Sequence, residues 1–289
     1  MVAVAEISGQ REIIFPEFVA LAIGAWVAEK QPWAANKRRI FFLMSISSVV
    51  GVEIVRHIPL PLLAQICIAF IFTGIILAIA RTNLLPVISA CILPIYMKTD
   101  TLIYPVSVSF LSLIIIYFQW FMEKSEIKTH NIYEKKEFNL KYEFEKWAKL
   151  LILLASISLL PIESGNIYFV APPLIVVFAE LADTDSPLRK KPLTLIFLLT
   201  LAATSGWAIR YLFNYYIHLP LAFCALIGSL VLFYVFEKVG TLLPPAGAIL
   251  LLPMIITSTD IRYYPLEIAV GSIIFVGAAL LMFNKKSKI

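Results

Sequence analysis

Cysteine, histidine and charged residues are all scarce in this chain of 289 residues. It has three cysteines, three histidines and 15% charged residues. The cysteines, Cys67, Cys91 and Cys224, lie singly inside apolar runs, so we predict neither a disulfide nor a metal site. The sequence also lacks a Cys-x-x-Cys, a His-x-x-x-His, a Ser-His-Asp arrangement and a phosphate-binding glycine loop. It therefore predicts no cofactor and gives no residues that support an enzyme.

Apolar residues are abundant instead. They make up 60% of the chain, and the mean hydropathy is +0.88, which is more than a soluble core of this length buries. A helix needs roughly 20 apolar residues to cross a bilayer core of about 30 Å, and about eleven apolar segments, some of them short, recur along the sequence. We therefore predict an all-α, polytopic transmembrane bundle in the cell membrane, with about 10–11 segments that include short or re-entrant helices.

The second half of the chain resembles the first. Residues of the same type recur in the same order, and the offset grows from 151 (180 − 29) to 160 (264 − 104), as small loop insertions would make it do. This pattern predicts two membrane repeats, 12–122 and 164–289, joined at 123–163 by a charged linker and a short connecting helix. The matched pairs include Glu29 and Glu180, Gly51 and Gly206, Pro86 and Pro245, Pro94 and Pro253, and Tyr104 and Tyr264.

Basic residues indicate the orientation of the segments. Each repeat has five apolar segments, and a further segment lies at 147–160. If every segment crosses the membrane, all the clusters of basic residues between segments lie on the same side of it. Short loops rich in basic residues stay in the cytoplasm, so this side is the cytoplasmic one. The repeats are then parallel, with the N-terminus outside and the C-terminus cytoplasmic. The net charge of +5 is explained by this role, so we predict no nucleic-acid partner. The segments are 12–28, 39–57, 60–80, 84–97 and 102–122, then 167–182, 193–213, 219–236, 242–257 and 263–283.

The fourth segment of each repeat is too short to cross as a helix. The 14 residues of 84–97 rise only about 21 Å as an α-helix. Their counterpart begins with Pro244-Pro245, which marks the first turn of a helix. Short segments with Pro and Gly at matching positions of two repeats indicate a transport site, because irregular backbone in a membrane has to be covered by protein or water. The alternative is that these residues only kink an ordinary packed helix.

The starts of these two short helices are the predicted binding site. Free amides and the positive end of the helix dipole would favour an anion there, and Gly247 would allow close packing. Three charged side chains are candidates for gating or proton coupling; the alternatives are interfacial carboxylates for the two acids and a lipid-interface anchor for the arginine. The binding candidates are Thr82, Asn83, Pro86, Thr241, Pro244, Pro245 and Gly247, and the gating candidates are Glu29, Glu180 and Arg210.

Two stretches carry a resemblance to a known family. "LLPPAGAILLLP" (242–253) and "FVAPPLIVVFAELADTDSPLRKKP" (169–192) resemble the conserved blocks of the HPP family of integral membrane proteins, in which His-Pro-Pro precedes Ala-Gly-Ala. Leu243 stands where the family has histidine, and Leu84 or Leu85 stands there in the first repeat. The resemblance implies a polytopic inner-membrane protein with about four spans per unit. It also implies nitrite as a candidate solute, because nitrite transport is attributed to plant plastid members.

The functional prediction is a permease for a small solute, an inorganic or small organic anion such as nitrite. The alternative is a membrane scaffold or partner subunit that does not transport, and a homo-oligomer stays open. An intramembrane enzyme would require clustered titratable groups, and Glu29 meeting Glu180 would be the place to look for them.

Overall fold

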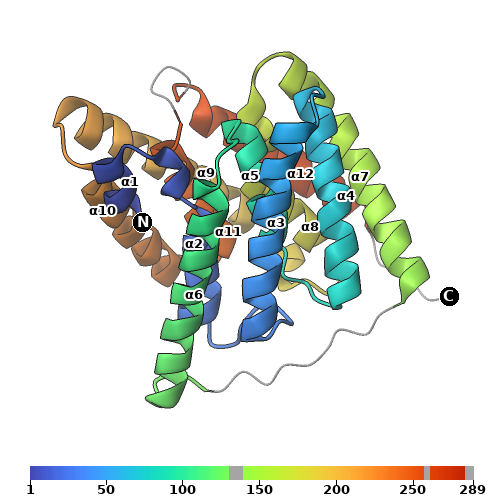
Figure 1. The fold of residues 1–289 in the computed structure, drawn as a ribbon, viewed down its shortest axis with the longest axis horizontal. Helices are drawn as coiled ribbons and strands as arrows, with labels where there is room; N and C mark the ends of the chain where they lie inside the picture. The colour runs from blue at the N-terminus through green and yellow to red at the C-terminus, as the bar shows by residue number, and fades with distance from the viewer. Residues whose placement is uncertain (130–138, 257–260, 284–289) are drawn as a thin grey trace.

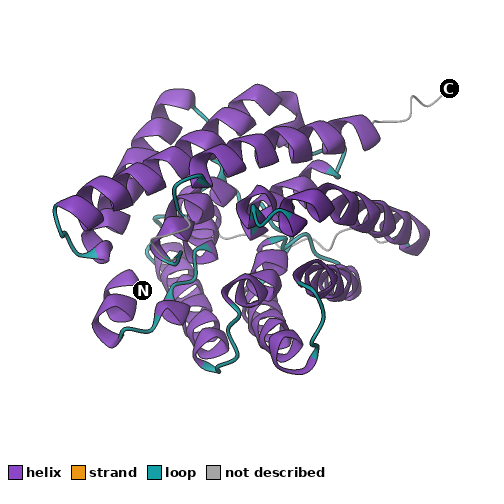
Figure 2. Ribbon diagram, turned by 90° about the horizontal axis from the view of Figure 1, so that it is seen from above, coloured by secondary structure: helices purple, strands orange, loops and turns teal. Residues whose placement is uncertain are grey.

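The computed structural model describes residues 1–129, 139–256 and 261–283. Every regular element among them is a helix, as Figure 2 shows, so the prediction of an all-α membrane bundle is confirmed. The last residue of the predicted segment 242–257, residues 284–289 of the predicted second repeat and residues 130–138 of the predicted linker lie outside the described residues. In chain order the elements are α1 (Val2–Ser8), η1 (Arg11–Ile13), α2 (Glu17–Ala22), η2 (Ile23–Val27), α3 (Lys37–His57), α4 (Leu62–Ala80), α5 (Pro86–Met97), α6 (Ile103–Lys124), α7 (Leu140–Glu163), η3 (Ile167–Val170), α8 (Pro172–Leu181), η4 (Pro187–Lys190), α9 (Pro192–Ile209), η5 (Arg210–Tyr216), α10 (Leu221–Val239), α11 (Pro244–Leu251), η6 (Leu252–Met254) and α12 (Tyr264–Met282).

Within the described residues, six helices are long and apolar enough to cross a membrane. They are α3, α4, α6, α9 with its π-helical continuation η5, α10 and α12, each 19 to 25 residues long. The chain is therefore a multi-pass membrane protein. Helix α7, which contains the predicted connecting segment 147–160, is longer than expected at 24 residues and packs against α4.

Four short helices stand apart from these spans, two in each half. Helix α2 with η2 covers 11 residues, α5 has 12, α8 has 10, and α11 with η6 covers 11. A 12-residue helix rises about 18 Å, well short of a hydrocarbon core of about 30 Å. The fourth segments are thus short, as predicted. The first segments, 12–28 and 167–182, were expected to be continuous and are broken instead, because Pro16 and Pro172 have no amide to continue a helix and so restart it.

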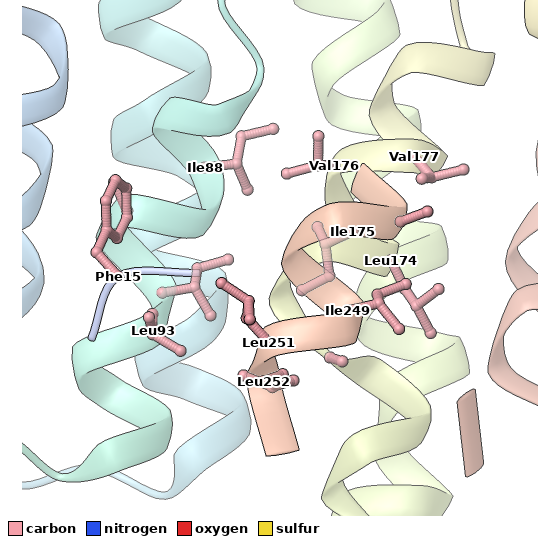
Figure 3. Close-up of a cluster of buried hydrophobic side chains, with 14 of the residues drawn as sticks. Phe15, Ile88, Leu93, Leu174, Ile175, Val176, Val177, Ile249, Leu251 and Leu252 are labelled. Atoms are coloured by element: carbon pink, nitrogen blue, oxygen red, sulfur yellow. The ribbon is translucent and has the colours of Figure 1, made fainter. Parts of the chain in front are cut away.

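The short helices pack crosswise between the two halves. Helix α5 of the first half contacts α8 of the second, and α11 of the second half contacts α2 of the first. Figure 3 shows the apolar side chains between them, with Ile88 on α5, Val176 on α8 and Leu251 on α11 pointing toward a common centre. Figure 1 shows α8 and α11 in the middle of the ribbon, with α3, α4 and α6 beside them. Because these apolar faces are buried against one another, the four short helices are held together at the centre of the bundle.

Glycines bring a long helix onto a short one in both halves. A Cβ atom built on Gly51 of α3 would lie 2.2 Å from the carbonyl oxygen of Cys91 in α5. A Cβ atom built on Gly206 of α9 would lie 2.2 Å from the carbonyl oxygen of Leu250 in α11. The offsets of 155 (206 − 51) and 159 (250 − 91) are those found in the sequence. Only glycine permits this backbone approach, and it is made at equivalent places in each half.

Prolines leave one carbonyl without its helical partner in α5 and one in α11, and in both cases a tyrosine supplies the missing donor. Pro94 in α5 has no amide hydrogen for the carbonyl of Ala90, and the Tyr104 hydroxyl donates to that oxygen at 3.0 Å. In the second half, Pro253 stands four residues after Ile249, whose carbonyl accepts from the Tyr264 hydroxyl at 2.6 Å. Both tyrosines are completely buried. The repeated Pro and Tyr residues therefore work as pairs that satisfy the backbone of the short helices.

We predict that Gly206→Ala lowers the thermal midpoint of the protein in detergent, because an added methyl group has to push α9 off α11. Overpacking of this kind costs about 1–3 kcal/mol. Gly277→Ala in α12 is the matched control, since its Cβ would meet no atom within 4 Å. An unchanged midpoint for Gly206→Ala, measured beside this control, would show that α9 and α11 are not in backbone contact.

A double-mutant cycle tests the proline and tyrosine pair. Tyr104→Phe leaves the buried Ala90 carbonyl without a donor and is expected to cost about 1–3 kcal/mol. Pro94→Ala restores the helical amide, so Tyr104→Phe is expected to cost less in that background. The measurement is the unfolding free energy of the four proteins in mixed micelles, and equal costs in both backgrounds would contradict the pairing.

Candidate functional site

The four short helices enclose a cavity of about 130 Å³. Its wall contains four of the predicted site residues, Pro86, Pro244, Pro245 and Glu180, so the starts of α5 and α11 do meet at one place. The remaining wall is apolar apart from one further acid, Glu17. The lining residues are Glu17, Ala20, Pro32, Trp33, Pro86, Pro173, Val176, Glu180, Pro187, Leu188, Leu242, Pro244, Pro245 and Ala248.

Glu17 is the most buried acid of this cavity. It is 2% exposed at the first position of α2, directly after Pro16. The hydroxyl of Ser89 in α5 donates to its Oε1 atom, and its Oε2 atom has no hydrogen-bond partner. The sequence interpretation missed Glu17 because it favoured acids that recur in both repeats, and the equivalent residue at the offset of 151 is Tyr168. The available signal was an acid inside an apolar segment just after a proline.

Glu180 connects the cavity to a second, larger cleft of about 300 Å³. Pro32, Glu180 and Pro187 line both spaces, so the cavity and the cleft are neighbours. The cleft is more polar than the cavity and is bounded by the end of α4, the first turns of α7 and the loop after α8. Its polar lining residues are Arg81, Thr82, Asn83, Glu143, Lys146, Glu180, Asp183, Asp185 and Ser186.

Thr82 and Asn83 line the cleft and hold a loop in place. The Thr82 hydroxyl donates to the carbonyl of Ala34 at 2.7 Å, and the Asn83 Oδ1 atom accepts from the Ala34 amide at 2.7 Å. The backbone amide of Thr82 donates to Leu77, and that of Leu85 donates to Asn83. Of the two amides predicted to be free for an anion at this helix start, that of Thr82 is thus already used by the backbone, and Pro86 has no amide hydrogen.

The start of α11 offers equally few amides. The amide of Thr241 donates to Phe236 and that of Ala246 donates to Leu243, while Pro244 and Pro245 have no amide hydrogen. Gly247 lies elsewhere: a Cβ atom built on it would come within 2.6 Å of Val19 in α2. Its role in the structure is close packing, and neither it nor Thr241 lines the cavity or the cleft.

The three gating candidates lie apart from one another. Glu29 is exposed in the loop after η2 and lines neither space, so Glu29 and Glu180 do not meet at the cavity. Arg210 is buried and donates from its Nη1 atom to the carbonyls of Pro253 and Ile256. A cation at this position neutralises the negative end of the α11 dipole, far along the helix from the cavity. Glu180 alone of the three lines the cavity.

The chemistry of the cavity follows from its wall. Two carboxylates face an otherwise apolar space, and Lys, Arg and His are absent from its lining residues. Among the described residues, no three side chains of the His, Cys, Asp or Glu type gather in a way that would hold a metal ion. The wall therefore places two titratable carboxyl groups in apolar surroundings.

The fold and this cavity define the class: a multi-pass helical membrane protein with a buried acidic cavity at its centre. No family model, no curated protein and no solved structure matches the chain. The resemblance to the HPP family stays a prediction.

We predict that the cavity contains water. In a background without Cys67, Cys91 and Cys224, Ala248→Cys is expected to react with a water-soluble methanethiosulfonate, because Ala248 lines the cavity. Ala246→Cys, two residues away on the same helix and fully buried, is the control and is expected to stay unmodified. Labelling is read by mass spectrometry of protein in liposomes. Equal protection of both cysteines would indicate a dry, sealed centre.

Proposed function

We propose that the chain is a permease for a small anion, such as nitrite or formate, that crosses together with a proton by way of the central cavity. The observation that carries the proposal is the meeting of four helix ends around one cavity that shares its wall with a polar cleft. Membership of the HPP family, location in the inner membrane and a cytoplasmic C-terminus belong to the same proposal.

The broken helices support transport over simple packing. A protein that needs only a stable bundle can be built from continuous helices, which satisfy every backbone group within themselves. Here four short helices end at the centre of the molecule, an arrangement used by transporters to place a solute site near the midplane. A cavity of about 130 Å³ holds a solute of a few heavy atoms.

The charge of the wall supports a proton as co-substrate. An anion is repelled by Glu17 and Glu180 when these are ionised, and the wall contains no basic side chain to offset them. Protonated carboxyl groups remove this repulsion and donate hydrogen bonds to the anion. The anion and the proton are therefore expected to enter together.

A scaffold or partner subunit is the second candidate. It is favoured by the hydrogen bonds that Thr82 and Asn83 make to the loop at Pro32 and Ala34, and by the burial of almost every residue of α5. In this case the short helices serve only to pack.

Solute flux into proteoliposomes decides between the two. The panel is nitrite, nitrate, formate and acetate, with methylammonium as the cation arm, and the rate in protein-free liposomes is subtracted because weak acids cross lipid as neutral molecules. We expect uptake of at least one anion and none of methylammonium. Uptake of methylammonium alone would refute the proposal that the solute is an anion. No uptake of any solute would leave the scaffold or partner subunit as the remaining candidate.

A variant that fills the cavity links any uptake to this site. Ala248→Leu adds three carbon atoms to the wall and is expected to reduce anion uptake at least about tenfold, because the solute and the leucine need the same space. Gly277→Leu adds a larger side chain where no atom lies within 4 Å of the new Cβ and is expected to transport normally. Equal uptake by the two variants would place the path elsewhere.

A further inference from the structure

We infer that Glu17 is the residue that carries the proton through the membrane domain, with Glu180 relaying it to the water of the cleft. This inference rests on the proposed permease function and adds the residue that binds the proton, its route to solvent and a stoichiometry. Glu17 was not among the candidates that the sequence suggested.

The first argument is the hydrogen bonding of the Glu17 carboxyl group. Its Oε1 atom accepts from Ser89, whereas its Oε2 atom is buried and has no hydrogen-bond partner among the residues that the structure describes. The Glu17 residue itself lines the cavity. A buried carboxylate oxygen without a hydrogen-bond partner is unfavourable, because burial removes the water that would otherwise solvate it. Two events remove this cost: the oxygen binds a proton, or a solute in the cavity supplies a donor.

The second argument is the set of groups that surround Glu17. From α5 it accepts a hydrogen bond from the Ser89 hydroxyl. From α6 and α12 come the phenols of Tyr104 and Tyr264, whose hydroxyl groups donate to backbone carbonyls, and Tyr168 and Glu267 lie beside Tyr264. From α8 comes Glu180, and the residues that α11 contributes to the wall are proline and alanine. None of these groups is a cation, so the proton itself neutralises Glu17.

The third argument is the position of Glu180. It lies at the C-terminal end of α8, is only partly buried, and belongs to both the cavity and the cleft. A carboxyl group at such a junction exchanges protons with water on one side and with the cavity on the other. It gives Glu17 a route to solvent that does not pass through the apolar wall.

The transport step balances in charge and atoms. Glu17 holds a proton on Oε2 and donates a hydrogen bond from it to an oxygen of the anion. Glu17 takes this proton from water on the side from which the anion enters the cavity. When the anion leaves toward the cleft, the O–H bond of Glu17 breaks and the proton passes to the cleft water by way of Glu180. The carboxylate then takes up a new proton from the entry side before the next turnover. One anion and one proton move together, no charge is transferred, and no oxidant or reductant is needed.

The stoichiometry follows from the asymmetry of the two halves. Tyr168 stands at the position equivalent to Glu17 (17 + 151), and the residue equivalent to Ser89 is Ala248 (89 + 159). The buried acid and its hydroxyl partner therefore occur once per chain. One proton carrier per chain limits accumulation to about tenfold for each unit of pH difference, the ratio that one proton per anion allows.

The test compares Glu17→Gln with wild type and with Glu237→Gln, an exposed acid at the end of α10, in proteoliposomes with [14C]formate. Two rates are measured: uptake driven by an acidic outside, and exchange of labelled for unlabelled formate without a pH difference. Gln cannot titrate but its amide still donates a hydrogen bond, so Glu17→Gln is expected to retain exchange and to lose all stimulation by the pH difference. Wild type and Glu237→Gln are expected to keep both.

Two outcomes overturn the inference. If Glu17→Gln is stimulated by the pH difference as wild type is, another group carries the proton. If it elutes as a folded, monodisperse protein in detergent but loses exchange as well, Glu17 has a solute-binding or structural role. If wild type takes up no formate, the chain is not a permease for this anion. The proton on Glu17 is then tested by the infrared measurement below.

Infrared spectroscopy tests the proton on Glu17 without any transport. The difference spectrum of wild type minus Glu17→Gln in lipid at neutral pH is expected to contain the carbonyl stretch of a protonated carboxyl group that is buried and slow to exchange in D2O. Its absence, with only the carboxylate bands of an ionised acid, overturns the inference.

Discussion

Hydrocarbon offers no partner to a peptide group, and the centre of this molecule is built from helices that are too short to cross it. Other features of the bundle supply partners for the backbone groups that these short helices leave without one. The prolines that interrupt α5 and η6 each deprive a carbonyl of its helical donor, and a buried tyrosine from the next long helix replaces the donor. Arg210 supplies the carbonyls at the end of α11 in the same way. The long helices thus hydrogen-bond the short ones as well as enclosing them.

The same constraint explains the glycines. A long helix can donate a side-chain hydrogen bond to a short helix, and shield its backbone from lipid, only if the two lie close together. Gly51 and Gly206 allow α3 and α9 to come into contact with the carbonyls of α5 and α11. Close approach, internal proline and buried tyrosine therefore form one structural device, and the device is present at equivalent positions in both halves of the chain.

The two halves have diverged at the cavity. Its wall combines Glu17 and Trp33 from the first half with Glu180 and the double proline from the second, so neither half makes the site alone. The crosswise packing of α5 on α8 and of α11 on α2 is what brings these residues together. The features that the two halves share hold the short helices in place. The residues in which the halves differ give the cavity its acidic side chains.

The sequence by itself determined the all-helical membrane class, the helix start at Pro244-Pro245, the shortness of 84–97 and 242–257, and the residue pairs at matching offsets. These features depend on hydropathy and on the geometry of single residues, which act over a few positions of the chain. Only the tertiary structure showed that Glu17 joins Glu180 at the cavity, that Thr82 and Asn83 hold a loop, and that Gly247 packs against Val19. Such partnerships join residues far apart in the chain, and the packing angle and register of whole helices decide them, which no local pattern encodes.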